Sequence, residues 1–147
     1  GHYLKEVSDG SVVVVGSDPQ GSIYSDPDDV HQYDIEGVGE DFFPEAFDRS
    51  IPDEIVQVTD AEAFEMTRRL ASEEGLLVGG SSGMAVVSAV KYAKEHDLDE
   101  NQLMVVILPD SGRGYLEKIF NDDWMRTHGY ADVVERTTPA PLASRYL

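Results

Sequence analysis

The chain has 147 residues, enough for one domain with its own core, and 41% of them are hydrophobic while 27% are charged. It contains no cysteine, which excludes a disulfide framework and a thiolate metal site. With 29 acidic against 11 basic residues the net charge is -18, which argues against nucleic acid or an anionic membrane surface as a partner.

The first half of the chain combines strand-like runs with loops rich in turn-forming residues. Residues 11–16 form a continuous, mostly β-branched run, which is typical of a strand buried on both faces. Residues 54–58 alternate in polarity and predict a second strand. Thr59 and Glu62 then have the spacing of a capping box, so a helix should begin there, and Gly75 should end it as a left-handed cap.

The second half is organised around residues 76–95, where apolar residues enter a turn of glycine and serine and continue into a helix that is apolar on nearly all sides. Residues 103–108 predict another fully buried strand. Helical patterns follow as far as Tyr130. We expect residues 131–147 to be a tail or linker, because the apolar pattern ends there.

Strands separated by helices predict an α/β fold, in which a mostly parallel sheet forms the middle of three layers. Ser81 lies where a strand passes into a helix, which is the end of a sheet at which α/β proteins bind ligands. Gly37 and Gly39, one residue apart, allow backbone N–H groups to face a ligand. The alternative for both stretches is an ordinary turn. The four histidines are scattered among polar neighbours and predict no metal site.

Several stretches, in the family's order and at its spacing, together resemble the cystathionine β-synthase family of fold-type-II pyridoxal-phosphate (PLP) enzymes, which are related to cysteine synthases. The matching stretches are residues 15–22, 36–42, 74–83, 106–115 and 118–125. The resemblance implies a three-layer fold like that of the tryptophan synthase β-subunit. Residues 1–130 would be the C-terminal portion of its catalytic domain.

The resemblance also implies roles for single residues. The hydroxyl of Ser81 would meet the pyridine nitrogen of PLP. The other implied residues are Gly80 and Gly37 at the cofactor, Glu36 and Gly39 in a loop on the substrate side, and Pro109 and Asp110 behind the ring nitrogen. No lysine of the chain matches the lysine that forms the Schiff base in the family. We therefore assign no catalytic residue and expect this piece alone to be inactive.

The function implied by the resemblance is the condensation of serine, or an activated serine, with homocysteine to give cystathionine. A neutral hydroxyl at Ser81 would favour loss of a β-substituent over transamination. Two alternatives stay open: a cysteine synthase that uses O-acetylserine and sulfide, and a non-catalytic binding or regulatory module derived from this fold. We further expect a cytoplasmic homodimer with amino-acid substrates, no membrane segment and no nucleic-acid partner.

Overall fold

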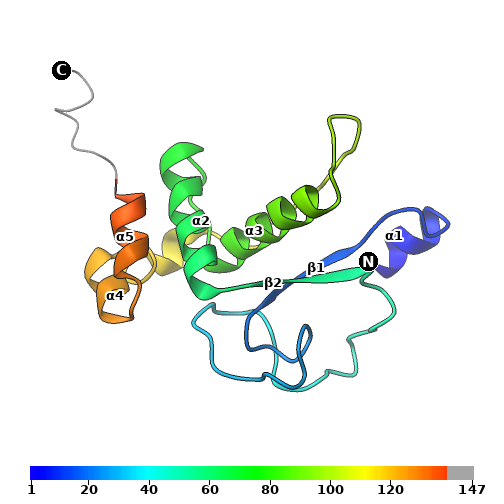
Figure 1. Cartoon of the computed structure of the whole chain (residues 1–147), viewed down its shortest axis with the longest axis horizontal. Coiled ribbons are helices and arrows are strands. Elements are labelled where there is room, and N and C mark those ends of the chain that lie inside the picture. The colour runs from blue at the N-terminus through cyan, green and yellow to red at the C-terminus, as the bar shows by residue number, and fades with distance from the viewer. Residues whose placement is uncertain (139–147) are drawn as a thin grey trace.

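The computed structural model describes residues 1–138 and shows an α/β architecture around two parallel strands (Figure 1). The elements in chain order are α1 (His2–Val7), β1 (Val15–Pro19), β2 (Glu54–Val58), α2 (Asp60–Glu73), α3 (Gly80–Glu95), the 3₁₀ helix η1 (Gly112–Tyr115), α4 (Asp122–Thr127) and α5 (Ala131–Thr137). Val15 lies opposite Glu54, and Pro19 lies opposite Val58. The predicted α/β fold with parallel pairing is confirmed.

Helix α2 begins and ends where the local sequence signals place its ends. The side chain of Thr59 accepts a hydrogen bond from the N–H of Glu62, whose carboxylate accepts the N–H of Thr59 at 2.9 Å. Gly75, just after the helix, has a φ of +72°, which is the left-handed conformation that glycine adopts without strain. Both predictions for this helix are confirmed.

Helices α2 and α3 pack closely because residue 83 has no side chain. A Cβ atom at Gly83 would lie 2.1 Å from Thr67 Oγ1 and 2.3 Å from the carbonyl oxygen of Ala63. Helix α3 covers one side of the strand pair and α2 packs on α3, while the long connection between β1 and β2 runs along the other side (Figure 1). This packing holds the N-terminus of α3 near the carboxyl ends of the strands.

The prediction of a tail from residue 131 is wrong for its first seven residues, which form α5. Val133 and Val134 are fully buried in the same core as Phe64 and Met125. Two adjacent valines are too few to show a helical period, so the signal for this helix lies in its packing on α2. The expectation for residues 139–147 lies outside the described residues.

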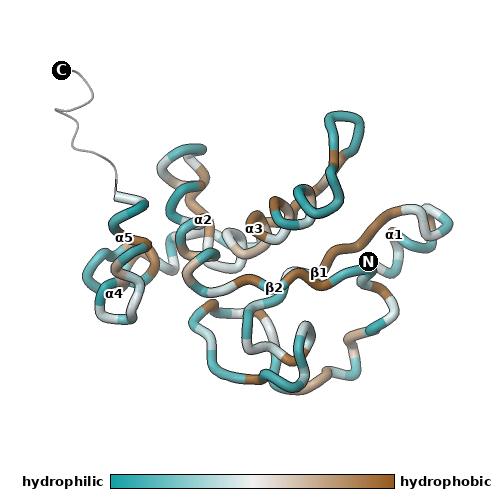
Figure 2. Tube along the Cα trace, viewed as in Figure 1, coloured by the Kyte–Doolittle hydropathy of each residue, from teal (hydrophilic) through white to brown (hydrophobic). Residues whose placement is uncertain are grey.

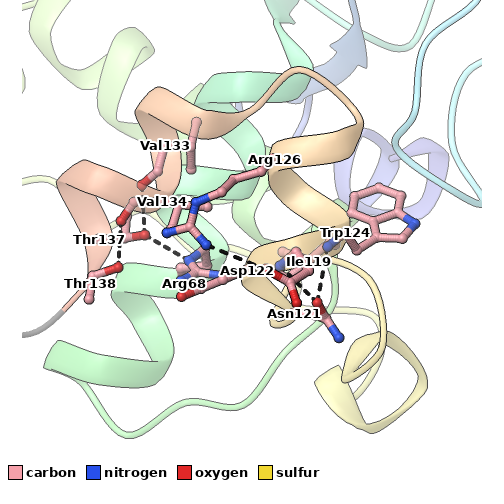
Figure 3. Close-up of polar contacts among 11 residues, drawn as sticks. Arg68, Ile119, Asn121, Asp122, Trp124, Arg126, Val133, Val134, Thr137 and Thr138 are labelled. Atoms are coloured by element: carbon pink, nitrogen blue, oxygen red, sulfur yellow. Dashed lines mark hydrogen bonds and ion pairs between the residues drawn. The ribbon is translucent and has the colours of Figure 1, made fainter.

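Arg68 on α2 joins the C-terminal helices to the rest of the fold (Figure 3). Its Nε donates to Thr137 Oγ1 at 2.7 Å, and its Nη1 donates to the carbonyl oxygen of Ile119 at 2.9 Å. Its Nη2 donates to Asp122 Oδ1 at 2.6 Å. The side chain is only 11% exposed, so water competes little with these bonds. Helices α4 and α5 therefore belong to the same folded body as α2.

Two apolar runs predicted as buried strands are largely exposed. The run before β1, brown in Figure 2, enters the strand only at Val15. Residues 103–108 form no strand within the part of the chain that the structure describes, and Leu103, Val105 and Ile107 are 91%, 80% and 78% exposed. Both runs line a groove of about 850 Å³ along α3. A buried strand needs neighbours for its backbone as well as apolar side chains.

Among residues 1–138, no helix has both the length and the apolar character needed to cross a lipid bilayer.

Candidate functional site

The N-terminus of α3 lies beside the segment that follows residue 108. Val78 and Ser111 form an antiparallel bridge, and the N–H of Gly79 donates to the carbonyl oxygen of Asp110 at 3.4 Å. The exposed Pro109 immediately precedes this contact. The structure thus brings the predicted pair Pro109 and Asp110 to the helix end that carries Ser81.

Asp110 is held in place by a neighbouring tyrosine. Tyr115 donates its hydroxyl proton to Asp110 Oδ2 at 2.7 Å. A Cβ atom at Gly79 would lie 2.1 Å from Asp110 Oδ1 and 2.7 Å from Tyr115 Cε2, so a larger residue there would have to displace these two side chains. The carboxylate is thereby fixed next to the N-terminus of α3, where the helix dipole favours a negative charge.

The hydrogen bond to Asp110 is also the main reason why the pKa of Tyr115 rises to about 12. Because the folded-state pKa lies above the ordinary value of 10.0, this bond stabilises the fold fully below that value and is lost as the pH rises through 12. We expect the ultraviolet difference titration of wild type minus Tyr115→Phe to show a step near pH 12. In an Asp110→Asn background the step should move back towards 10, and a step near 10 in both backgrounds would contradict the bond.

Two serine hydroxyls in the first turn of α3 have unused hydrogen-bonding capacity. Ser81 is 8% exposed, and its side chain makes no hydrogen bond to any residue in the range 1–138. Ser82 Oγ is fully buried and has no partner among the same residues. Buried hydroxyls normally find a partner, so this turn is suited to a polar ligand group. The hydroxyl of Ser81 stays the predicted contact to the pyridine nitrogen.

Gly80 faces the protein core. A Cβ atom there would lie 3.0 Å from Ile119 Cδ1 and 3.4 Å from Phe64 Cε1, with Ile35 Cγ2 at 3.8 Å. The close approach of Ile35 brings the start of the predicted substrate-side loop to the first turn of α3. The cofactor contact predicted for Gly80 is not visible in this packing and stays a prediction.

The substrate-side loop needs its two glycines for different reasons. Both have positive φ, +75° at Gly37 and +69° at Gly39. At Gly39 a Cβ atom would also lie 2.4 Å from the hydroxyl oxygen of Tyr33, which donates to the carbonyl oxygen of Val38 at 3.0 Å. Gly37 has open space around it within the described chain. The loop is thus closed by Tyr33 and leaves Gly37 accessible.

Glu36 joins this loop to the segment after Asp110 through an ion pair with Lys118. The side chains are 52% and 43% exposed, so the pair orients the loop more than it stabilises the fold. The sequence alone predicts no role for Lys118. The one local pattern that could have indicated a role for Lys118 is its position three residues after Tyr115, because side chains at this spacing share one face of a helical turn.

The site therefore consists of three stretches that are distant in the sequence: residues 33–39, residues 78–83 and residues 109–118. Within residues 1–138 no group of three or more His, Asp or Glu side chains is arranged to hold a metal ion.

The chain is similar to known proteins over most of its length. The family described as "Pyridoxal-phosphate dependent enzyme" matches residues 1–110. The chain is 44% identical over 143 residues to a cystathionine β-synthase of Oryctolagus cuniculus, covering 94% of this chain and 25% of that protein. It is 42% identical over 136 residues to the cystathionine β-synthase of Saccharomyces cerevisiae, covering 88% of this chain and 27% of that one.

A solved structure has the same fold. It is described as the crystal structure of O-acetylserine dependent cystathionine β-synthase from Helicobacter pylori. The match has a TM-score of 0.71 and 38% identity, and it covers 80% of this chain and 37% of that chain. The predicted resemblance is confirmed, and the chain spans about a quarter of the length of the curated relatives it matches.

Proposed function

This chain belongs to the family of pyridoxal-phosphate dependent enzymes, and from that premise we propose that it is part of a cystathionine β-synthase. The enzyme would replace the β-substituent of serine, or of an activated serine, with homocysteine. The observation that carries the proposal is the meeting of three distant stretches at the N-terminus of α3, each of which matches a motif of that family. The identity of 44% to a named cystathionine β-synthase supports the same reaction class.

The residues at this end of α3 fit the cofactor. Ser82 Oγ has no partner among the described residues, Ser81 beside it is nearly buried, and Asp110 already accepts a hydrogen bond from Tyr115. Ser81 would therefore hold the pyridine nitrogen, with Gly80 and Gly37 nearby and with Pro109 and Asp110 behind it. PLP, when bound, withdraws electrons from the α-carbon of the amino acid. A neutral hydroxyl partner leaves the ring nitrogen without a carboxylate to keep it protonated, which favours β-replacement.

The substrate side of the site belongs to the loop from Glu36 to Gly39. The open backbone at Gly37 would meet the substrate, and the pairing of Glu36 with Lys118 would hold the loop towards the cofactor.

A partial catalytic domain also accounts for the apolar groove along α3. The exposed side chains of Leu103, Val105 and Ile107 suit contact with further sheet strands. In this proposal the remainder of the catalytic domain covers the groove, and the portion described here extends through α5, to Thr137. The proposal includes a homodimer in the cytoplasm, as the resemblance implies. Light scattering and cell fractionation of the full-length protein test these two points.

The second candidate differs in substrates. The similar Helicobacter pylori protein is named an O-acetylserine dependent enzyme, which favours an activated serine as the donor. Assays of the full-length protein with serine or O-acetylserine, each combined with homocysteine or sulfide, separate the possibilities. Preference for sulfide would point to a cysteine synthase. Absence of turnover with all four pairs would contradict the proposal that the full-length protein is a β-replacement enzyme.

Replacing Ser81 with alanine tests the cofactor contact. Loss of one neutral hydrogen bond should cost about 1 kcal/mol, so kcat/KM should fall by about fivefold in the full-length enzyme while the fold is kept. The absorption band of bound PLP should shift as well. The matched control is Ser72→Ala on the exposed end of α2. Unchanged absorption and turnover in Ser81→Ala would contradict the contact.

A further inference from the structure

The segment that leads into the substrate-side loop is attached to the N-terminus of α2. Asp60, the first residue of that helix, accepts the N–H of Asp34 at 2.9 Å with Oδ2 and the N–H of Ile35 at 3.1 Å with Oδ1. A carboxylate in the first turn is also favoured by the helix dipole. One side chain therefore fixes two consecutive peptide groups immediately before Glu36.

Tyr130 completes this attachment from the other end of the chain. Its hydroxyl donates to Asp34 Oδ2 at 2.6 Å and lies 3.3 Å from Asp60 Oδ2. Its ring packs edge-on against Phe64, with 4.9 Å between the ring centroids. The hydroxyl is thus held between two carboxylates, which would otherwise repel each other across a partly buried space.

The ionisation states of these groups agree with the geometry. Burial and the hydrogen bond to Asp34 raise the pKa of Tyr130, so the phenol stays protonated and remains a donor. Burial raises the pKa of Asp60, which is the expected effect when a carboxylate leaves water. We call Tyr130, Asp34 and Asp60 the Tyr130 cluster.

The cluster acts where the loop has no regular structure of its own. Residues 33–39 lie in no helix or strand, so no ladder of backbone hydrogen bonds sets their position. Ile35 is 3% exposed and sits beside Gly80, and Glu36 follows it directly. The position of the loop relative to α3 therefore depends on the bonds from Asp60 and Tyr130 before Glu36 and on the ion pair with Lys118. The far end of the loop is held separately, where the N–H of Glu40 donates to Ser22 Oγ at 3.1 Å.

We infer that the Tyr130 cluster positions the loop from Glu36 to Gly39 for binding of the amino-acid substrate. Tyr130 and Asp60 are positioning residues in this inference and touch neither substrate nor cofactor. That this loop binds an amino-acid substrate rests on the function proposed above. Tyr130 lies beyond residue 110, where the family match ends, so the loop is held by a part of the chain that the match does not include.

The test uses the full-length protein and two separate measurements. The first is hydrogen exchange without added PLP, in which Tyr130→Phe should make the amides of residues 34–39 exchange about tenfold faster, because one bond to a carboxylate is lost. Amides within α2 and α3 should keep their rates. The second is steady-state kinetics, in which KM for the amino-acid substrate should rise about fivefold while kcat changes less than twofold.

Four further variants extend the test. Asp60→Ala should accelerate exchange at residues 34–39 more than Asp60→Asn, which keeps one acceptor oxygen. Tyr3→Phe, at a tyrosine that is 70% exposed on α1, is the matched control and should change neither measurement. If Tyr130→Phe does not fold, Asp34→Asn removes the charge from the same bond and is expected to show the same local pattern.

The outcomes separate this inference from the proposed function. Faster exchange confined to residues 34–39 supports the cluster, even if the wild-type protein has no β-replacement activity, and that absence overturns the proposed function alone. Exchange that is unchanged in Tyr130→Phe, or faster throughout the chain, overturns the inference. A fall in kcat with unchanged KM also overturns it, because positioning of a substrate loop acts on binding.

Discussion

Gly83→Ala is expected to lower the free energy of unfolding by about 3 kcal/mol, because the added Cβ has no space between α2 and α3. It would lie 2.3 Å from the carbonyl oxygen of Ala63 and 2.8 Å from the backbone nitrogen of Thr67. Neither backbone atom can move unless the helices separate. Urea unfolding of the full-length protein measures the loss as a lower midpoint with an unchanged slope.

Gly114→Ala is the matched control for that experiment. Gly114 lies in η1, and an added Cβ would meet no heavy atom within 4 Å in the part of the chain that the structure describes. This change should alter stability by less than about 0.5 kcal/mol. Because alanine has a higher helix propensity than glycine, similar losses for the two variants would contradict the contact between α2 and α3 as the cause.

Arg68→Ala should lower the free energy of unfolding by about 2 to 3 kcal/mol. The change removes three hydrogen bonds and the packing of a nearly buried side chain. Asp122 is 41% exposed and can be rehydrated, which keeps the loss below that for breaking a fully buried ion pair. Because the bonds hold α4 and α5, hydrogen exchange should accelerate first in those helices.

The neighbouring arginine provides the comparison. Arg69 pairs with Glu73 one turn along α2, and the two side chains are 46% and 51% exposed. Arg69→Ala should therefore cost only about 0.3 to 0.5 kcal/mol. Arg68→Lys keeps the charge but not the planar arrangement of donors. Its loss in free energy of unfolding should lie between those of Arg68→Ala and Arg69→Ala. Equal losses at the two arginines would contradict the role of Arg68 as the link to α5.

Part of the candidate site could be predicted because its residues act through local chemistry. The turn at residues 79–83 and the glycine pair at Gly37 and Gly39 have compositions that suit few conformations, and the family motifs include them. The roles of Lys118, Tyr115 and Tyr130 could not be predicted. Each depends on a partner that the fold brings near, and the sequence around it resembles that of many surface helices.

Local sequence patterns were sufficient to predict the bounds of α2, the strand from Glu54 to Val58 and the position of Ser81 at the start of a helix. Helix caps, alternating polarity and glycine turns depend on residues that are close in the chain, so the amino-acid sequence alone predicts them. Packing between distant segments was needed to show that residues 103–108 form no strand among the described residues and that Val133 and Val134 lie in a helix. It also joined Lys118 to Glu36 across 82 positions and Tyr130 to Asp34 across 96. Contacts at such separations depend on how whole elements pack, which no local pattern encodes.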